Sequence, residues 1–166
     1  MAVATIPGLS SLGVLFGYAC ETTKGTKPAA FSTLQRCNAI DGISVENEQI
    51  DASALEDTMT KYIAGRGDPG GVWNVTFNIT SETIPELTAM IDAYYNASTG
   101  AKKDGKAMWC EVYHPNLTDG FFVKVEPPTK IPMPAWGQNE LSTVEIGFTI
   151  VSYEGMDTAI VPTVTP

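Results

Sequence analysis

Two segments in which apolar and polar side chains alternate strictly constrain the fold of this chain more than any other feature. In residues 72–80 the apolar side chains are those of Trp73, Val75, Phe77 and Ile79. In residues 143–150 they are those of Val144, Ile146, Phe148 and Ile150. Successive side chains of a strand point to opposite faces, so both segments are predicted to be half-buried β-strands. Burying each of these side chains contributes about 1.5–3 kcal/mol before entropy is subtracted.

Weaker patterns predict further strands on both sides of a single helix. The strands are expected at Leu15–Cys20, Leu34–Ile40, Lys106–His114 and Gly120–Val125. Thr83 and Glu86 have the spacing of a capping box, and Pro85 suits the first helical turn. Apolar residues then recur on one helical stripe, which comprises Ile84, Leu87, Met90, Ile91, Tyr94 and Tyr95. The helix is expected to end within residues 96–105, which are small, polar and basic.

The order of these elements predicts a mainly β (α+β) fold. Strands, one helix and more strands favour an antiparallel β-sandwich or barrel with one flanking helix over alternating βαβ units. The length of 166 residues suits a single domain. We place that domain at residues 1–154.

Three segments do not suit compact packing. Residues 44–71 show no strand of convincing length and form an over-long acidic loop, and such loops tend to be functional. Residues 127–134 contain four prolines and are expected to be an extended crossing or edge segment. Residues 155–166, apolar and rich in threonine, are a C-terminal arm with nothing obvious to pack on in a monomer. Disorder and docking on a neighbouring subunit remain equally open for this arm.

The charge balance excludes two classes of partner. The chain carries 10 basic and 19 acidic residues, for a net charge of -9. Binding nucleic acid through its phosphates, or docking on anionic lipid, needs a surplus of lysine and arginine. No apolar run approaches the roughly 20 residues that span a bilayer, and the first residues lack the basic segment of a secretory leader. Three cysteines are too few for a disulfide framework. We interpret them as reduced thiols of a protein made in cytosol.

No motif in the sequence supports catalysis or a cofactor. Residues 65–70 match G-x-G-x-x-G, but a predicted strand follows where the dinucleotide fingerprint needs a helix. Zinc ligation by Cys20, Cys37, Cys110 and His114 fails, because the last two would lie about 13 Å apart along one strand. His114 also lacks the partners of a triad and is expected in a turn. We therefore predict no catalytic residue, no cofactor and no metal site, and a chain that is not an enzyme.

Two longer motifs point to a known family. They are Phe16-Gly-Tyr-Ala-Cys-Glu-Thr-Thr-Lys-Gly-Thr-Lys-Pro28, and Tyr62-Ile-Ala-Gly-Arg-Gly-Asp-Pro-Gly-Gly71 leading into the strand at 73–80. With the following helix and a closing strand at 141–152, the chain resembles the major tail tube proteins of long-tailed (siphovirus-type) bacteriophages. The resemblance implies a small β-sandwich or barrel with a flanking helix, related to the ring protein of type VI secretion. The proline-rich segment 127–134 departs from the family pattern.

The resemblance also implies a function and partners. Six copies would form a ring, and stacked rings would form the virion's tail tube, assembled in the host bacterial cytoplasm. Partners would be other copies and the tape measure, tail terminator and distal tail proteins, with no membrane. The loop at 44–71 and the arm would contact neighbouring subunits and rings. The expected contact residues in that loop are Glu46, Glu48, Asp51, Leu55, Tyr62, Ile63, Arg66 and Asp68.

The negative charge agrees with a tube that conducts DNA. A bore lined by acidic side chains repels phosphates, so DNA passes through it without specific binding. Glu145, at a polar position of the last strong strand, is a candidate lumen residue, and a solvated outer face is the alternative.

A glycan-binding β-sandwich module is the competing hypothesis. It would use Trp73, Trp109 or Trp136 as a stacking platform, although Trp73 lies on an apolar strand face and suits the core better. An enzyme using Cys110 or His114 is a third and weaker hypothesis.

Overall fold

The computed structural model describes residues 7–164. Two sequence expectations fall on residues outside this range. They are that the first six residues lack the basic segment of a secretory leader, and that the last two belong to the C-terminal arm. The elements in chain order are β1 (Leu15–Cys20), β2 (Ser32–Leu34), β3 (Cys37–Ile40), β4 (Glu46–Asp51), β5 (Tyr62–Asp68), β6 (Val72–Asn78), α1 (Thr83–Tyr95), a short 3-10 helix (Ala101–Asp104), β7 (Met108–Tyr113), β8 (Asp119–Glu126) and β9 (Thr143–Thr158). Within residues 7–164, neither helix is long and apolar enough to span a membrane.

A seven-stranded antiparallel sheet forms the body of the molecule, in the order β2-β1-β7-β8-β9-β6-β3. The two strongly alternating segments are confirmed as the neighbouring strands β6 and β9. Their apolar residues pair in register, as Trp73 with Phe148 and Val75 with Ile146, so both strands bury the same face. The mainly β fold with one flanking helix is confirmed.

The two edges of this sheet come close together and give it the shape of an incomplete barrel. β2 and β3 lie at opposite edges, yet only Gln35 and Arg36 separate them in the sequence. The prediction of one strand over residues 34–40 is therefore wrong. Arg36 has a φ of 57°, a left-handed conformation that a strand cannot continue through. The Arg36 carbonyl accepts the N–H of Asn78 at 2.9 Å, which fixes this corner to the end of β6.

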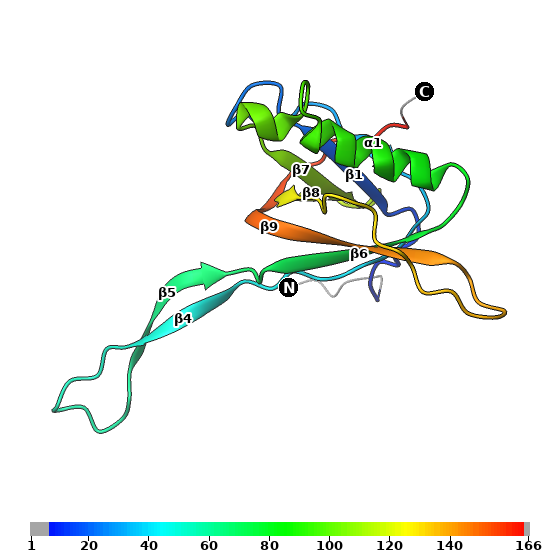
Figure 1. Cartoon of the computed structure of the whole chain (residues 1–166). Coiled ribbons are helices and arrows are strands. Elements are labelled where there is room, and N and C mark those ends of the chain that lie inside the picture. Colours follow the sequence, from blue (N-terminus) through cyan, green and yellow to red (C-terminus); the bar gives the residue numbers. More distant parts are fainter. Residues whose placement is uncertain (1–6, 165–166) are drawn as a thin grey trace.

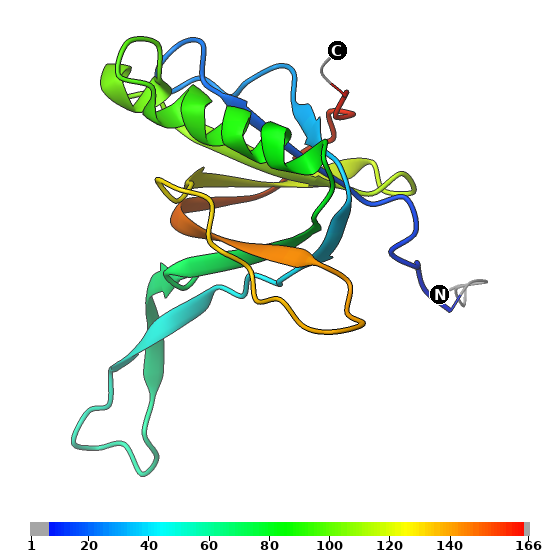
Figure 2. The ribbon, with the colours of Figure 1, turned by 45° about the vertical axis from the view of Figure 1, so that its right-hand side comes forward.

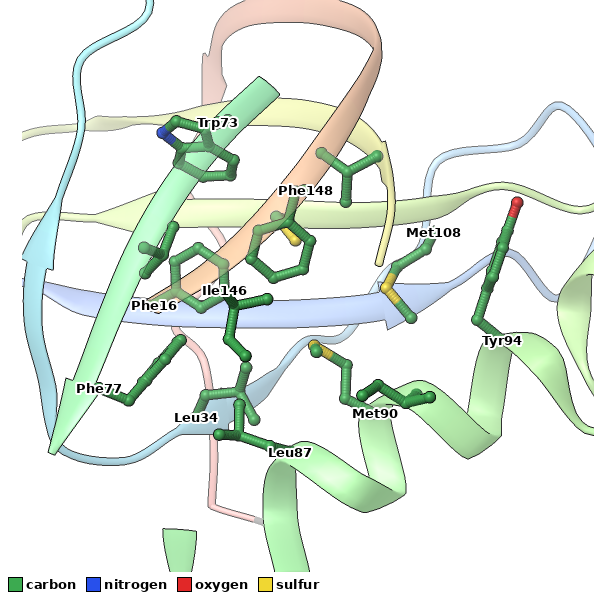
Figure 3. Packing of buried hydrophobic residues seen from close by; sticks show 14 of the residues in the cluster. Phe16, Leu34, Trp73, Phe77, Leu87, Met90, Tyr94, Met108, Ile146 and Phe148 are labelled. Carbon is green, nitrogen blue, oxygen red and sulfur yellow. The ribbon is translucent and has the colours of Figure 1, made fainter. Parts of the chain in front are cut away.

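Helix α1 lies across one side of the barrel and closes its core (Figures 1 and 2). The predicted apolar stripe is confirmed, since Leu87, Met90 and Tyr94 are buried and point toward the sheet (Figure 3). On the sheet side, Phe16 is at the centre of an aromatic group. Its ring centroid lies 5.6 Å from that of Trp73, and 5.7 and 5.9 Å from those of Phe77 and Phe148, the other members of the group. Such aromatic pairs add about 0.5–1.5 kcal/mol each beyond area burial.

The predicted capping box does not form, because other partners satisfy both of its side chains. The hydroxyl of Thr80, not that of Thr83, accepts the first helical N–H, at 3.1 Å. The Thr83 hydroxyl instead donates to the carbonyl of Asn78 at 2.9 Å. The Glu86 carboxylate accepts the backbone N–H and the side-chain amide of Gln35, at 3.0 and 2.7 Å. Glu86 therefore ties the helix to the corner between β2 and β3.

The absence of a strand from residues 44–71 is also a wrong prediction. β4 and β5 pair as an antiparallel hairpin, a separate two-stranded sheet that projects away from the barrel (Figures 1 and 2). Every residue of β4 is exposed, so no buried face imposed the alternation by which strands are recognised. We call residues 44–71 the assembly hairpin, after the role that the sequence analysis predicts for them.

The C-terminal segment packs on its own chain, contrary to the expectation for residues 155–164. β9 continues to Thr158, and its last residues pair with β8. Beyond it, the backbone carbonyl of Thr163 accepts the N–H of Thr33 at 2.8 Å, and the backbone N–H of Thr163 donates to the carbonyl of Phe31 at 3.0 Å. Ile160 packs against a small second core on the outer side of the sheet, formed by Phe31, Trp109 and Phe122. This segment therefore covers an apolar surface that the sequence pattern left unassigned.

Candidate assembly interface

The two strands of the assembly hairpin are held together by their own backbone pairing. Its strands pair Ile50 with Ile63 on one face and Asp51 with Tyr62 on the other. Near the barrel its register shifts once.

The tip of the assembly hairpin is closed by a local network. The N–H of Ala52 donates to the carbonyl of Lys61 at 2.8 Å, and the N–H of Lys61 donates to the Ser53 hydroxyl at 2.8 Å. The Asp57 carboxylate forms an ion pair with the Lys61 ammonium and accepts the N–H of Ala54 at 2.7 Å. Lys61 first, and then Ala54, lower the pKa of Asp57 below its ordinary value. The tip is thus a defined structure and not a loose loop.

The outer surface of the assembly hairpin is unusually apolar for a segment in contact with water. Its large exposed apolar residues are Val45, Ile50, Leu55, Met59, Tyr62 and Ile63. The side chain of Leu55 is fully exposed, and that of Met59 is 80% exposed. β4 and β5 pack principally on each other, and an isolated two-stranded hairpin is marginal in water. The hairpin therefore has the composition of a surface that a partner covers.

Two glycines let the strands of the hairpin approach closely. A Cβ atom on Gly67 would lie 2.9 Å from the Val45 Cγ1 atom, and one on Gly65 would lie 3.0 Å from the Ile50 Cδ1 atom. These glycines are the first two of the G-x-G-x-x-G match. In the structure they let β5 pack closely against β4 and its preceding residue. The strand β6 follows them, as the sequence analysis expected.

The structure places all eight predicted contact residues on the assembly hairpin, and all eight are exposed. Glu46, Glu48 and Asp51 lie on β4 and Leu55 lies at the tip; the remaining four, Tyr62, Ile63, Arg66 and Asp68, lie on β5. Sequence reasoning missed Val45, Ile50 and Met59. Ile50 carried a signal, because it is the single large apolar residue of a polar strand and faces Ile63 across the ladder.

Glu145 lies elsewhere, on the outer face of the barrel. It belongs to β9, is exposed, and stands opposite Thr76 of β6. Its neighbours Val144 and Ile146 point into the core, as the alternation predicts.

Two of the three tryptophans are unable to serve as a stacking platform for a sugar. Trp73 is buried, and its indole N–H donates to the carbonyl of Asp41 at 2.7 Å. Trp109 is buried, and its indole N–H donates to the Glu21 carboxylate at 2.9 Å. Trp136 alone of the three is exposed, at 65%. The glycan-binding hypothesis is therefore not favoured.

The thiols and the histidine have structural surroundings. Burial raises the pKa values of Cys20 and Cys37 to about 11, and that of Cys110 well above the ordinary value. These groups are thus thiols, not thiolates, at neutral pH. His114 accepts the N–H of Asn116 at 3.1 Å on Nδ1, and its Nε2 atom lies 2.7 Å from the carbonyl of Ser10, as suits a turn. Residues 7–164 contain no group of three or more His, Cys, Asp or Glu side chains suited to a metal ion.

The sequence matches no family model and no curated protein. Solved structures do share its architecture. A chain in the tail of an empty gene transfer agent particle with C6 symmetry is 15% identical, with a TM-score of 0.55 over 92% of this chain and 100% of that one. The virion of the native gene transfer agent particle gives the same values.

A third neighbour comes from a baseplate. It is a chain of the anti-feeding prophage baseplate, symmetrised sixfold, which is 12% identical with a TM-score of 0.54 over 94% of this chain and 97% of that one. These identities are low, so the likeness establishes the fold. The resemblance that the sequence motifs indicated is thereby confirmed for the architecture: the chain has the fold of chains in a tail and a baseplate of phage-like particles.

Proposed function

We propose that this chain is a structural subunit of a phage-type tail tube. Copies assemble into hexameric rings, the rings stack into a hollow tube in the virion tail, and DNA passes through without specific binding. The observation that supports this proposal most is the assembly hairpin, which exposes six large apolar side chains. It occurs in a chain that shares its fold with chains of a tail and a baseplate.

The energetics of the hairpin support assembly. Each leucine or isoleucine side chain that passes from water into an interface contributes about 1.5–3 kcal/mol. Leu55 offers that gain in full, whereas Ile50 and Ile63, which are 46% and 56% exposed, offer about half of it each. The eight exposed hairpin residues predicted from the sequence are the proposed contacts between subunits and rings.

The charge of the chain supports a DNA-conducting lumen. Six copies with a net charge of -9 give a ring formally near -54, although salt screens it over about 8–10 Å. A bore of this sign repels the phosphates of DNA, whereas a basic bore would bind them through counterion release. Glu145, exposed on β9, is our proposed lumen residue.

The remaining parts of the proposal follow from the tube. The chain acts without catalysis. Its partners are its own copies, the tape measure protein, the tail terminator protein and the distal tail protein. Assembly takes place in the host bacterial cytoplasm. The proposed domain, residues 1–154 in the sequence analysis, extends to the end of β9 at Thr158. The terminal segment, residues 155–166, adds contacts between subunits beyond those it makes within its own chain.

The experiment is an assembly assay on the purified full chain. Sedimentation and negative-stain microscopy of concentrated protein are expected to show tubes, or rings of about 107 kDa for six copies of 17.8 kDa. The variant Leu55→Asp with Ile63→Asp is expected to stop tube growth and keep the far-UV spectrum of the fold. Thr58→Asp with Thr60→Asp adds the same charge to exposed positions of the tip and is the matched control. A wild-type chain that stays monomeric at high concentration contradicts the proposal.

A further inference from the structure

Four lysines gather at the end of the molecule opposite the assembly hairpin. Lys24 lies in the turn after β1, and Lys102, Lys103 and Lys106 lie in the turns that follow α1. Both views show these turns at the top of the molecule and the hairpin at the bottom (Figures 1 and 2). The two turns touch, since a Cβ atom on Gly105 would lie 3.2 Å from the Lys24 ammonium. We call these four residues the lysine patch.

A buried carboxylate holds the two turns together. Glu21 is 5% exposed and accepts the indole N–H of Trp109 at 2.9 Å and the N–H groups of Gly25 at 2.9 Å and Ala107 at 3.2 Å. Its own N–H donates to the carbonyl of Ala107 at 3.0 Å. Burial raises the pKa of Glu21, but these hydrogen bonds outweigh burial and lower it overall. The ionised Glu21 therefore fixes the backbone that carries the lysine patch.

The lysine patch has little compensating charge. Asp104 is the one acidic residue in the sequence of the two turns, 22–25 and 96–107, which gives a net charge of +3, or +2 with the buried Glu21 that bonds both turns. Within residues 7–164 none of the four lysines forms an ion pair. The Lys103 ammonium lies 3.4 Å from the carbonyl of Ser98, and that of Lys102 lies 5.2 Å from the Tyr95 ring centroid. The patch is thus a positive surface on a chain with a net charge of -9.

The assembly hairpin carries the opposite charge. Residues 44–71 contain six acidic and two basic residues, for a net charge of -4. One of the two bases, Lys61, is already paired with Asp57. The carboxylates of Glu46, Glu48 and Glu56 are exposed and have no hydrogen-bond or ion-pair partner in the described part of the chain. Each copy therefore presents an acidic arm at one end and a basic surface at the other.

We propose that the lysine patch is the surface that receives the acidic assembly hairpin of a second copy in the next ring. Complementary patches at opposite ends of one chain produce a heterologous, head-to-tail contact, which repeats along a stack instead of closing a dimer. Opposite charges steer such an encounter and select its orientation. Nucleic acid suits the patch less well, because the surrounding negative charge repels phosphates. This inference rests on the proposed tube function and adds the identity of the receiving surface.

A charge-swap experiment tests the contact on the full chain. Lys102→Glu with Lys103→Glu is expected to raise the protein concentration needed for tube growth by about tenfold or more, because like charges then meet. Glu48→Lys with Glu56→Lys is expected to have the same effect from the other side. Combining all four changes in one chain restores opposite charges, and tube growth is expected to return to near the wild-type concentration. Lys130→Glu, one substitution of the same kind at an exposed site elsewhere, is the control and is expected to leave growth unchanged.

The outcomes separate this inference from the function itself. A wild-type chain that forms neither rings nor tubes overturns the proposed function. If the wild type forms tubes and Lys102→Glu with Lys103→Glu leaves their growth unchanged, the receiving surface alone is overturned. The same holds if the quadruple variant needs as high a protein concentration for tube growth as the two double variants. Binding of a short DNA duplex by the wild-type chain and not by the patch variant, with equal tube growth of both, assigns the patch to nucleic acid instead. Far-UV spectra of all variants confirm that these exposed substitutions keep the fold.

Zero-length crosslinking provides a direct readout. Carbodiimide treatment of tubes grown from mixed 14N and 15N chains is expected to join hairpin carboxylates to the lysine patch between chains of different label. Links from the hairpin to Lys130 in place of the patch contradict the proposal.

Discussion

The barrel and the assembly hairpin use similar backbone pairing but differ in what covers their strands. β6 alternates buried and half-buried residues after its exposed first residue because the core and α1 cover one of its faces, whereas every residue of β4 is exposed. The barrel buries its core within one chain, whereas in the proposed tube the hairpin is covered by another chain. The difference teaches that the burial pattern of a strand shows whether one of its faces is covered within its own chain. A strand without such cover is a candidate for contact with another subunit.

Removing 14 residues from either region gives the largest expected contrast. Truncation after Ser152 removes residues 153–166, which pair with β8 and cover the second core. We expect this variant to lose its cooperative unfolding transition. Deletion of residues 51–64 removes as many residues from the hairpin and is expected to keep the transition and stop tube growth. Thermal unfolding and microscopy check the pair, and an unfolded hairpin deletion breaks the comparison.

A pair of alanine variants makes the same comparison at single residues. Phe16→Ala opens a cavity among the core aromatic rings and is expected to lower the free energy of unfolding by about 3–5 kcal/mol. Leu55→Ala, at a fully exposed position, is expected to change it by less than about 0.5 kcal/mol. Urea unfolding of dilute, unassembled protein measures both. Similar losses for the two variants would mean that the tip packs on its own subunit in solution.

Glu21→Gln tests the support of the lysine patch. The amide places a donor against the N–H groups that the carboxylate accepts, so we expect a loss of about 1–3 kcal/mol at neutral pH. The folded pKa of Glu21 is lowered, so its stabilisation is present above the ordinary glutamate pKa and is lost as the pH falls through the lowered value. Urea unfolding at pH 7 and at acidic pH is expected to show the gap between the two proteins shrinking. A gap independent of pH contradicts an ionised Glu21.

The smallest expected effect concerns Glu111, a fully buried carboxylate beneath the C-terminal segment. Its Oε1 atom accepts the N–H of Ile160 at 2.9 Å, and its Oε2 atom has no partner within residues 7–164. Burial raises the pKa of Glu111, and the hydrogen bond from the Ile160 N–H and, less strongly, the nearby Lys27 oppose the shift. The folded state therefore loses stability as the pH rises from the ordinary glutamate pKa through the raised value. Glu111→Gln removes this loss, so its stability relative to wild type is expected to be greater at pH 8 than at pH 5 in urea unfolding. An equal difference at both values contradicts the assignment.

The parts of the fold that could be predicted are those in which burial imposed a pattern on the sequence. The strands at Trp73 to Ile79 and Val144 to Ile150 were recognisable because every second side chain is directed into the core. The stripe of α1 was recognisable because every third or fourth side chain packs against the sheet. The strands of the hairpin left no such pattern, since water covers both faces in the single chain. The break at Arg36 gave no signal either, because a left-handed φ was adopted by a residue that ordinarily avoids it.

The candidate interface was predictable only in part. Its location followed from the length and charge of residues 44–71, but Ile50 and Met59 were missed among polar neighbours. The lysine patch was hidden because Lys24 is far from Lys102 in the sequence, and their turns meet through the pairing of β1 with β7 and the hydrogen bonds of Glu21. The capping box failed for a similar reason, since Gln35 competes for the Glu86 carboxylate.

The corner at Gln35 and Arg36 has a consequence for how the chain tolerates crowding. An open sheet offers unpaired backbone groups along both borders, and such borders invite strands of foreign chains. Here the corner brings β2 and β3 close to each other, and Thr163 occupies the outer side of β2. The covered border of β2 leaves fewer free backbone groups there for unspecific stacking. In the proposed tube this would favour ordered polymerisation through the arms over amyloid-like growth.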